Sequence, residues 1–186
     1  MEMQIVNELV KSRESFMYVN VDNHLFKRVR NSEYVDKSEL IALTNKVIDT
    51  EDQYICVTRP RRFGKSVTVK MLNAYYSKGC DSKALFSDLK IASSPDFESH
   101  LNQHDVIYLD MTEFADNKDN GNKYLENLNT NVVSELKDTY RDFFDKDKSY
   151  SLPEAIRCLK KRFIFIIDEW DFVFREYPNN LQLHKK

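Results

Sequence analysis

Apolar and polar positions alternate along the first half of the chain in blocks that predict short elements. Near the N-terminus, residues 16–21 (FMYVNV) predict a short strand or an extended arm. Residues 37–48 (KSELIALTNKVI) carry apolar side chains at helical spacing, and residues 66–77 (SVTVKMLNAYYS) predict a second helix. The apolar run at residues 54–58 (YICVT) predicts a strand, and Gly79 is expected to cap the second helix.

The second half continues the alternation of strands and helices. Residues 105–111 (DVIYLDM) predict a strand, residues 122–144 a long amphipathic helix, and residues 152–161 a shorter helix with Pro153 in its first turn. Residues 163–167 (FIFII) are apolar at every position, as expected for a parallel strand covered on both faces. The order of elements predicts an α/β domain with a mainly parallel sheet and flanking helices.

Composition limits the partners that this chain is expected to have. Hydrophobic residues make up 41% of the 186 positions, enough for a core, and 28 Lys and Arg nearly balance 30 Asp and Glu. This balance does not favour nucleic acid as a partner. No apolar run is long enough to cross a membrane. Two of the three cysteines border apolar elements and are expected to be buried thiols, which indicates a reducing cytoplasm.

A candidate phosphate-binding loop, residues 59–66 (RPRRFGKS), lies between the predicted strand at 54–58 and the following helix. Backbone N–H groups at a helix N-terminus attract anions. Gly64 allows close approach of the backbone, Lys65 is expected to reach the terminal phosphates of ATP, and the Ser66 hydroxyl is expected to bind Mg²⁺. The expected phosphate contacts come from Arg61, Arg62, Phe63, Gly64, Lys65, Ser66 and Val67.

This loop departs from the usual pattern at its first position, where Arg59 replaces glycine. A side chain there costs roughly 1 kcal/mol if the backbone is left-handed. Pro60 removes one N–H donor, whereas Arg61 and Arg62 add positive charge that offsets a poorer cradle. The alternative is a basic surface turn that contains Gly-Lys-Ser by chance, and the flanking strand and helix favour the phosphate loop over it.

A pair of carboxylates, Asp168 and Glu169, follows the strand at 163–167. We expect Asp168 to hold Mg²⁺. Lys65 and Glu169 are the expected catalytic residues, with Glu169 as the general base that activates water. Asp171 could approach the metal, but a helix N-cap for residues 172–176 is the favoured interpretation. The alternative for the pair is an ordinary acidic turn at the end of a strand.

Three blocks of the chain resemble the bacterial AAA-ATPase-like family, whose members often carry a nuclease-like region of the PD-(D/E)xK type. They are residues 34–41 (YVDKSELI), 58–66 (TRPRRFGKS) and 163–171, which end in DEWD. The resemblance implies a P-loop NTPase fold with ATP and Mg²⁺ as cofactors. It also implies that Arg59 is a family feature, that Lys65 and Ser66 bind phosphate and Mg²⁺, and that Asp168 and Glu169 serve hydrolysis.

The same resemblance implies that the chain stops soon after its acidic block, so that later strands of the sheet are missing. We therefore expect residues 1–50 to pack on a partial ATPase domain at 51–186. We also expect a gap between the strands at 54–58 and 163–167, and self-association or a missing C-terminal region as partner. Weak or no hydrolysis is expected from the chain by itself.

Two alternatives to ATP hydrolysis stay open. One is a nucleotide-binding or interaction module without turnover, and the other, by analogy alone, is a nucleic-acid-associated defence or mobile-element factor. A zinc site at His100 and His104 is disfavoured, because no third ligand is evident beside them.

Overall fold

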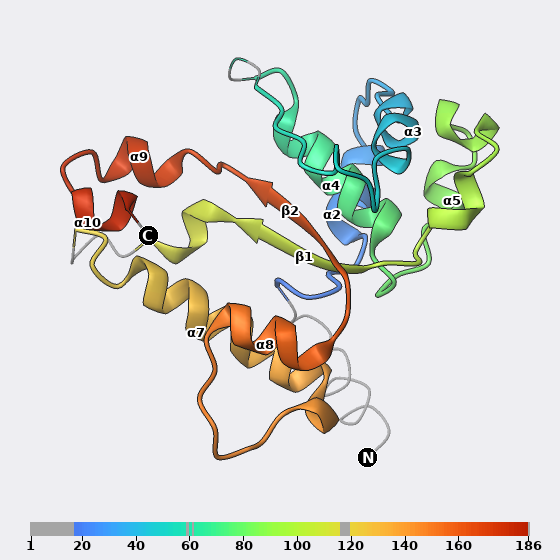
Figure 1. Cartoon of the computed structure of the whole chain (residues 1–186). Coiled ribbons are helices and arrows are strands. Elements are labelled where there is room, and N and C mark those ends of the chain that lie inside the picture. The colour runs from blue at the N-terminus through green and yellow to red at the C-terminus, as the bar shows by residue number, and fades with distance from the viewer. Residues whose placement is uncertain (1–16, 59, 61, 116–119, 186) are drawn as a thin grey trace, which may run out of the picture. The chain divides into compact units, whose positions relative to one another are not determined.

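A computed structural model describes residues 17–58, 60, 62–115 and 120–185, and Figure 1 shows the elements. The described residues divide into two compact units, which are taken one at a time below. The first unit contains residues 17–19, the stretch from 108 to 162 and the stretch from 167 onward. The second unit contains residues 20–107 and 163–166.

The second unit is mainly helical and contains the candidate phosphate loop. Its helices are α2 (His24–Arg30), α3 (Glu39–Asn45), α4 (Lys65–Tyr76), α5 (Lys83–Phe86), the 3₁₀ helix η1 (Lys90–Ser93) and α6 (Phe97–His100). The helices predicted at 37–48 and 66–77 are therefore confirmed as α3 and α4. The C-terminal half of α4 enters the core, where Tyr75 packs edge-on against Phe86, and Phe86 stacks on Phe26 of α2.

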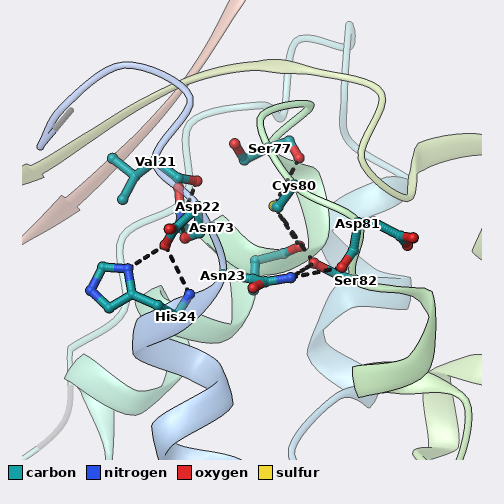
Figure 2. A network of polar contacts seen from close by, with 10 residues as sticks. Val21, Asp22, Asn23, His24, Asn73, Ser77, Cys80, Asp81 and Ser82 are labelled. Carbon is teal, nitrogen blue, oxygen red and sulfur yellow. Dashed lines mark hydrogen bonds and ion pairs between the residues drawn. The ribbon is translucent and has the colours of Figure 1, made fainter. Parts of the chain in front are cut away.

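A polar network fixes both neighbouring chain segments to the same half of α4 (Figure 2). Asn73, which is 2% exposed, donates from Nδ2 to the carbonyls of Val21 and Asp22. Asn23 donates to the Ser82 hydroxyl at 2.9 Å, so the segment after α4 is tied to the segment before α2. These bonds hold the C-terminal half of α4, and through it they position the loop at its other end.

Gly79 does not cap α4, so that prediction is wrong. The helix ends at Tyr76, its C-cap Ser77 is extended, and Gly79 is not among the described residues with positive φ. The reason for glycine is close packing instead, because a Cβ at position 79 would lie 2.1 Å from the Asn20 carbonyl oxygen. Backbone cannot yield as the end of a flexible side chain can.

The first unit is built on α7 (Tyr124–Thr139), against which α8 (Leu152–Leu159) packs (Figure 1). Its other helices are η2 (Met111–Phe114), η3 (Arg141–Phe143), α9 (Phe172–Glu176) and α10 (Leu181–His184). The helix predicted at 152–161 is confirmed. Ser151 and Glu154 form a capping box at its start, and Pro153 lies between them. The helix predicted at 122–144 is shorter, because Tyr140 leaves the helical conformation and η3 follows.

Glu135 of α7 anchors the N-terminal arm of this unit. Its carboxylate is 8% exposed and accepts the backbone N–H groups of Met17, Tyr18 and Val19 at 3.0, 2.9 and 2.6 Å. The Tyr18 carbonyl accepts in turn from the N–H of Tyr108. Residues 17–20 form bends around a single β-bridge residue, Val19, so neither a strand nor an extended arm is confirmed there. Burial raises the pKa of the Glu135 carboxyl, although the three N–H donors oppose this.

The sheet in the described chain pairs β1 (Asp105–Asp110) with β2 (Phe163–Asp168), and the two arrows run in the same direction (Figure 1). Both predicted strands are therefore confirmed. On β2, Ile166 and Asp168 are buried, whereas Phe165 is 44% and Ile167 is 43% exposed. This alternation indicates cover on one face, so the prediction that β2 is covered on both faces is wrong.

Residues 54–58 do not form a strand, so the prediction for this run is wrong. All five residues are exposed, with Tyr54 at 89%, and the sheet of β1 and β2 does not include them. An isolated extended segment lacks the ladder of hydrogen bonds that stabilises a strand, however apolar its side chains are. Because residues 54–58 form no strand, the predicted gap between two strands stays untested.

The cysteine side chains also differ from expectation. Cys56 and Cys158 are exposed and Cys80 is partly buried, so the prediction of two buried thiols is wrong for the pair that borders apolar elements. All three thiols are free. Within the described chain, no helix has the length and apolar character to cross a membrane.

Gly79→Ala should lower the free energy of unfolding by about 1–3 kcal/mol, because the new methyl group collides with the Asn20 carbonyl. Urea denaturation measures the change. Lys46→Ala, at an exposed position of the same unit, should stay within about 0.5 kcal/mol of the original protein. Equal stability of the two variants would contradict the close-packing account of Gly79.

Glu135→Ala should lower the free energy of unfolding by about 2–4 kcal/mol near pH 5, because the buried N–H groups of Tyr18 and Val19 lose their acceptor. Because the folded pKa of Glu135 is raised, the carboxylate's contribution falls as the pH rises through that pKa. The loss should therefore be smaller near pH 8. Glu126→Gln, on an exposed position of α7, is the control. A loss that grows with pH would contradict the assignment.

Candidate functional site

The phosphate-loop end of α4 has an unusual backbone. Gly64 is the N-cap, with φ 79° and ψ 25° in the left-handed region. Arg62 also has a positive φ of 68°, whereas Phe63 between them is not among the described residues with positive φ. Alternation of this kind turns successive N–H groups toward a common point, the geometry of anion-binding nests. A left-handed arginine is costly, and such strain is concentrated at functional sites.

Side chains around the first turn of α4 support this loop. Thr68 donates to the Gly64 carbonyl from both its N–H and its hydroxyl at 3.0 Å, which closes the first turn. The Lys65 ammonium lies back over the loop, 3.4 Å from the Pro60 carbonyl oxygen. Ser66 and Val67 are partly buried in the next positions. The first turn of α4 contains no acidic residue, so the helix itself does not offset the positive potential at this end.

Lys37 reaches the same loop, although the sequence did not mark it as a site residue. Its Nζ donates to the Phe63 carbonyl at 2.8 Å. The available signal was its position inside the block at residues 34–41, ahead of the phosphate loop. Only a tertiary contact shows that its ammonium lies beside Gly64, where an added Cβ would be 2.9 Å from Nζ.

The acidic end of β2 lies in the first unit. Asp168 is 5% exposed, and its Oδ1 accepts the N–H of Glu169 at 3.0 Å. Burial, and next to it the charge of Asp168, raises the pKa of the Tyr108 hydroxyl. A carboxylate with this degree of burial is poorly solvated by water, so a bound cation would stabilise its charge.

Glu169 has a strained backbone, and its carboxylate forms an ion pair with Arg175. Its φ is 51°, in the left-handed region that glycine favours. The carboxylate accepts from Arg175 Nη2 at 2.7 Å, while Nη1 of the same guanidinium contacts Asp171 at 3.2 Å. The hydrogen bond to Glu169 raises the pKa of Arg175. Arg175 was missed from the sequence, where the signal was its spacing of four residues after Asp171 on a predicted helix.

Asp171 occupies the position that the sequence favoured for it. It is the N-cap residue of α9, but its side chain makes no capping hydrogen bond and pairs with Arg175. Its role is therefore to hold the same guanidinium as Glu169.

The remaining predicted residues are placed as follows. Arg59 and Arg61 lie outside the described residues. Lys65 and Ser66 belong to the second unit, and Asp168 and Glu169 belong to the first. His100 Nδ1 and His104 Nε2 are 2.9 Å apart in stacked rings. Over the described ranges, no cluster of three or more His, Cys, Asp or Glu side chains is arranged to hold a metal ion.

Comparison with known proteins shows the family to which these features belong. A family model described as Predicted AAA-ATPase, of the AAA-ATPase-like family, matches residues 20–185. No curated protein and no solved structure matches the chain. The match includes the loop at 59–66 and the carboxylates Asp168 and Glu169 at the end of β2, and it extends over most of the sequence. The chain is a member of the AAA-ATPase-like family.

Proposed function

We propose that this protein binds ATP with Mg²⁺ at residues 59–66 in a P-loop NTPase fold and hydrolyses it slowly, so that the chemistry drives a conformational change. The observation that carries the proposal is the backbone at the start of α4, where positive φ angles at Arg62 and Gly64 shape a nest of N–H donors. Membership of the AAA-ATPase-like family supports it.

Binding of the phosphates follows from groups at this end of α4. The N–H donors of Phe63, Gly64, Lys65 and Ser66 approach the anion, and the dipole of a twelve-residue helix favours negative charge there. Lys65 neutralises the terminal phosphates, and Arg62 adds a guanidinium on the exposed side of the loop. Arg61 and Val67 complete the proposed contacts.

The Mg²⁺ part of the proposal rests on the chemistry of the oxygen donors, one in each unit. Hydroxyl and carboxylate oxygens are the ligands that this cation prefers, and the proposed ligands are Ser66 and Asp168. Asp168 uses one lone pair of Oδ1 on the Glu169 N–H, so its other lone pairs can accept a cation or its water. When bound, Mg²⁺ neutralises charge that develops on the phosphates.

Glu169 is the proposed base that accepts a proton from the attacking water. Arg175 and the strained backbone fix the orientation of its carboxylate. Its Oε2 accepts the bond from Arg175, so the other oxygen has lone pairs for a water molecule. Arg175 is therefore proposed to position the base rather than to react.

The same ion pair favours a second candidate, a nucleotide-binding module without turnover. The Glu169 carboxylate is already engaged by Arg175, and a base held in this way has less freedom to follow the water. Turnover distinguishes the two candidates, because both bind ATP. Self-association, a further C-terminal region as partner and a domain division at residue 50 stay predictions.

Lys65→Ala should weaken Mg²⁺–ATP binding by about 10- to 100-fold, because a charge-assisted contact with the phosphates is removed. Isothermal titration calorimetry measures the affinity. Lys70→Ala, one turn or more further along α4, removes the same charge and should bind nearly as the original protein does. Unchanged affinity in Lys65→Ala would place the nucleotide elsewhere.

Glu169→Gln should retain ATP and slow single-turnover hydrolysis by about 10²- to 10⁴-fold, because the amide cannot accept the proton of water. Rapid-quench measurement of labelled phosphate gives the rate. Glu176→Gln, at an exposed position of α9, is the matched control. Wild-type rates in Glu169→Gln exclude it as the base. No turnover in the original protein, with ATP bound, would select the module without hydrolysis.

A further inference from the structure

Lys37 joins the start of α4 from a distant part of the sequence within the second unit. Its Nζ is 2.8 Å from the Phe63 carbonyl oxygen and would be 2.9 Å from a Cβ on residue 64. The ammonium is therefore in contact with the two residues that lead into α4. The side chain itself is exposed, so a ligand can approach it from solvent.

The backbone around Lys37 is anchored on both sides. Asp36 accepts the N–H of Ser38 at 2.8 Å and the N–H of Lys90 at 2.9 Å. Ser38 is fully buried, and its hydroxyl accepts the N–H of Ile91 at 3.1 Å. Burial alone would raise the pKa of the Asp36 carboxyl, but hydrogen bonds from Lys90 and Ser38 lower it below its ordinary value. Lys37 thus projects from a fixed turn.

A second support for this turn comes from α4. The Tyr34 hydroxyl contacts the Met71 sulfur at 3.3 Å, and Phe26 packs edge-on against the Tyr34 ring. The segment that presents Lys37 and the helix that presents Lys65 are therefore parts of one packed body. The position of Lys37 beside the loop follows from this packing.

Electrostatics at this position favour the binding of an anion. The N-terminal end of a helix carries about half a positive charge, and the first turn of α4 has no acidic residue to offset it. Arg62 and Lys65 already add two cations at this end. Lys37 adds a third cation, which the other two repel, whereas the negative charge of a bound polyphosphate would attract all three.

Glycine at position 64 fits the same arrangement. Its φ of 79° is left-handed, and an added Cβ would press against the Lys37 ammonium. The positive φ is what requires glycine at position 64, whereas a shift of the flexible Lys37 side chain could relieve the contact with a Cβ. The contact with Phe63 uses one of the three ammonium donors, so the others can reach phosphate oxygens.

We propose that Lys37 is a second lysine of the nucleotide site, which binds the phosphate chain of ATP together with Lys65. The inference rests on the proposed ATP-binding function and extends it to a residue outside the phosphate loop. The recognised group is the polyphosphate, so inorganic tripolyphosphate should depend on Lys37 as ATP does.

The test compares Lys37→Met, Lys37→Arg and the control Lys46→Met, which removes an exposed lysine of the same unit. Calorimetry with Mg²⁺–ATP and with tripolyphosphate is repeated at several salt concentrations. Lys37→Met should weaken both ligands about tenfold and make the dependence of affinity on salt shallower, since one cation fewer meets the phosphates. Lys37→Arg should keep most of the affinity, and Lys46→Met should keep all of it.

The outcomes separate this inference from the function on which it rests. If Lys65→Ala also leaves affinity unchanged, the proposed ATP site is wrong. If Lys65→Ala weakens binding while Lys37→Met does not, the inference alone is overturned. A loss in Lys37→Met with an unaltered salt dependence also overturns it, because Lys37 then only braces the loop through Phe63.

A measurement on the unmodified protein covers the case in which Lys37→Met does not fold. Acetylation by a small amine-reactive reagent is followed by mass spectrometry with and without tripolyphosphate. Lys37 should be protected several-fold by the ligand, whereas Lys46 should react at an equal rate in both samples. Equal reaction of Lys37 with and without tripolyphosphate would overturn the proposal.

Discussion

Positive charge at the N-terminal end of α4 is the constraint on which the account of this protein depends. The helix dipole, Lys65, Arg62 and Lys37 all contribute to it within one unit, and the first turn contains no carboxylate. Such a concentration of positive charge favours the binding of an anion at this end of the helix. The left-handed backbone at Arg62 and Gly64 adds strain to the same few residues, and it aims N–H donors where an anion would lie.

The rest of the second unit holds this strained end in place. The partly buried first half of α4 depends on its buried second half, where Tyr75 packs in an aromatic core and Asn73 ties the helix to the chain before α2. In the first unit, Arg175 imposes a comparable order on Glu169, whose backbone is also left-handed. Each unit thus has a left-handed residue where we assign chemistry, although Asn20, Asp49, Asn102, Asn120 and Lys160 share this conformation.

Sequence patterns predicted the elements whose stability is local. The α4 helix, β1, β2 and α8 lie where periodicity and capping placed them, because these signals come from neighbouring residues. Residues 54–58 failed because a strand needs a partner that the pattern cannot supply. Gly79 was misread because its packing partner, Asn20, is 59 positions earlier in the numbering.

The candidate site was predictable to the same extent. The loop and the carboxylate pair follow from local motifs, and the spacing of Arg175 from Asp171 was a local signal too, whereas Lys37 enters through a tertiary contact. The glycines offer the most direct test of the central claim, that the loop at the start of α4 binds Mg²⁺–ATP. There are only three of them, so [¹⁵N]glycine labelling gives one amide signal each for Gly64, Gly79 and Gly121. Carbonyl-¹³C phenylalanine then identifies Gly64, the only glycine that follows a phenylalanine. Titration with Mg²⁺–ATP should shift the Gly64 amide strongly and saturably while Gly79 stays in place, and a Gly64 signal unmoved at saturating nucleotide would contradict the account.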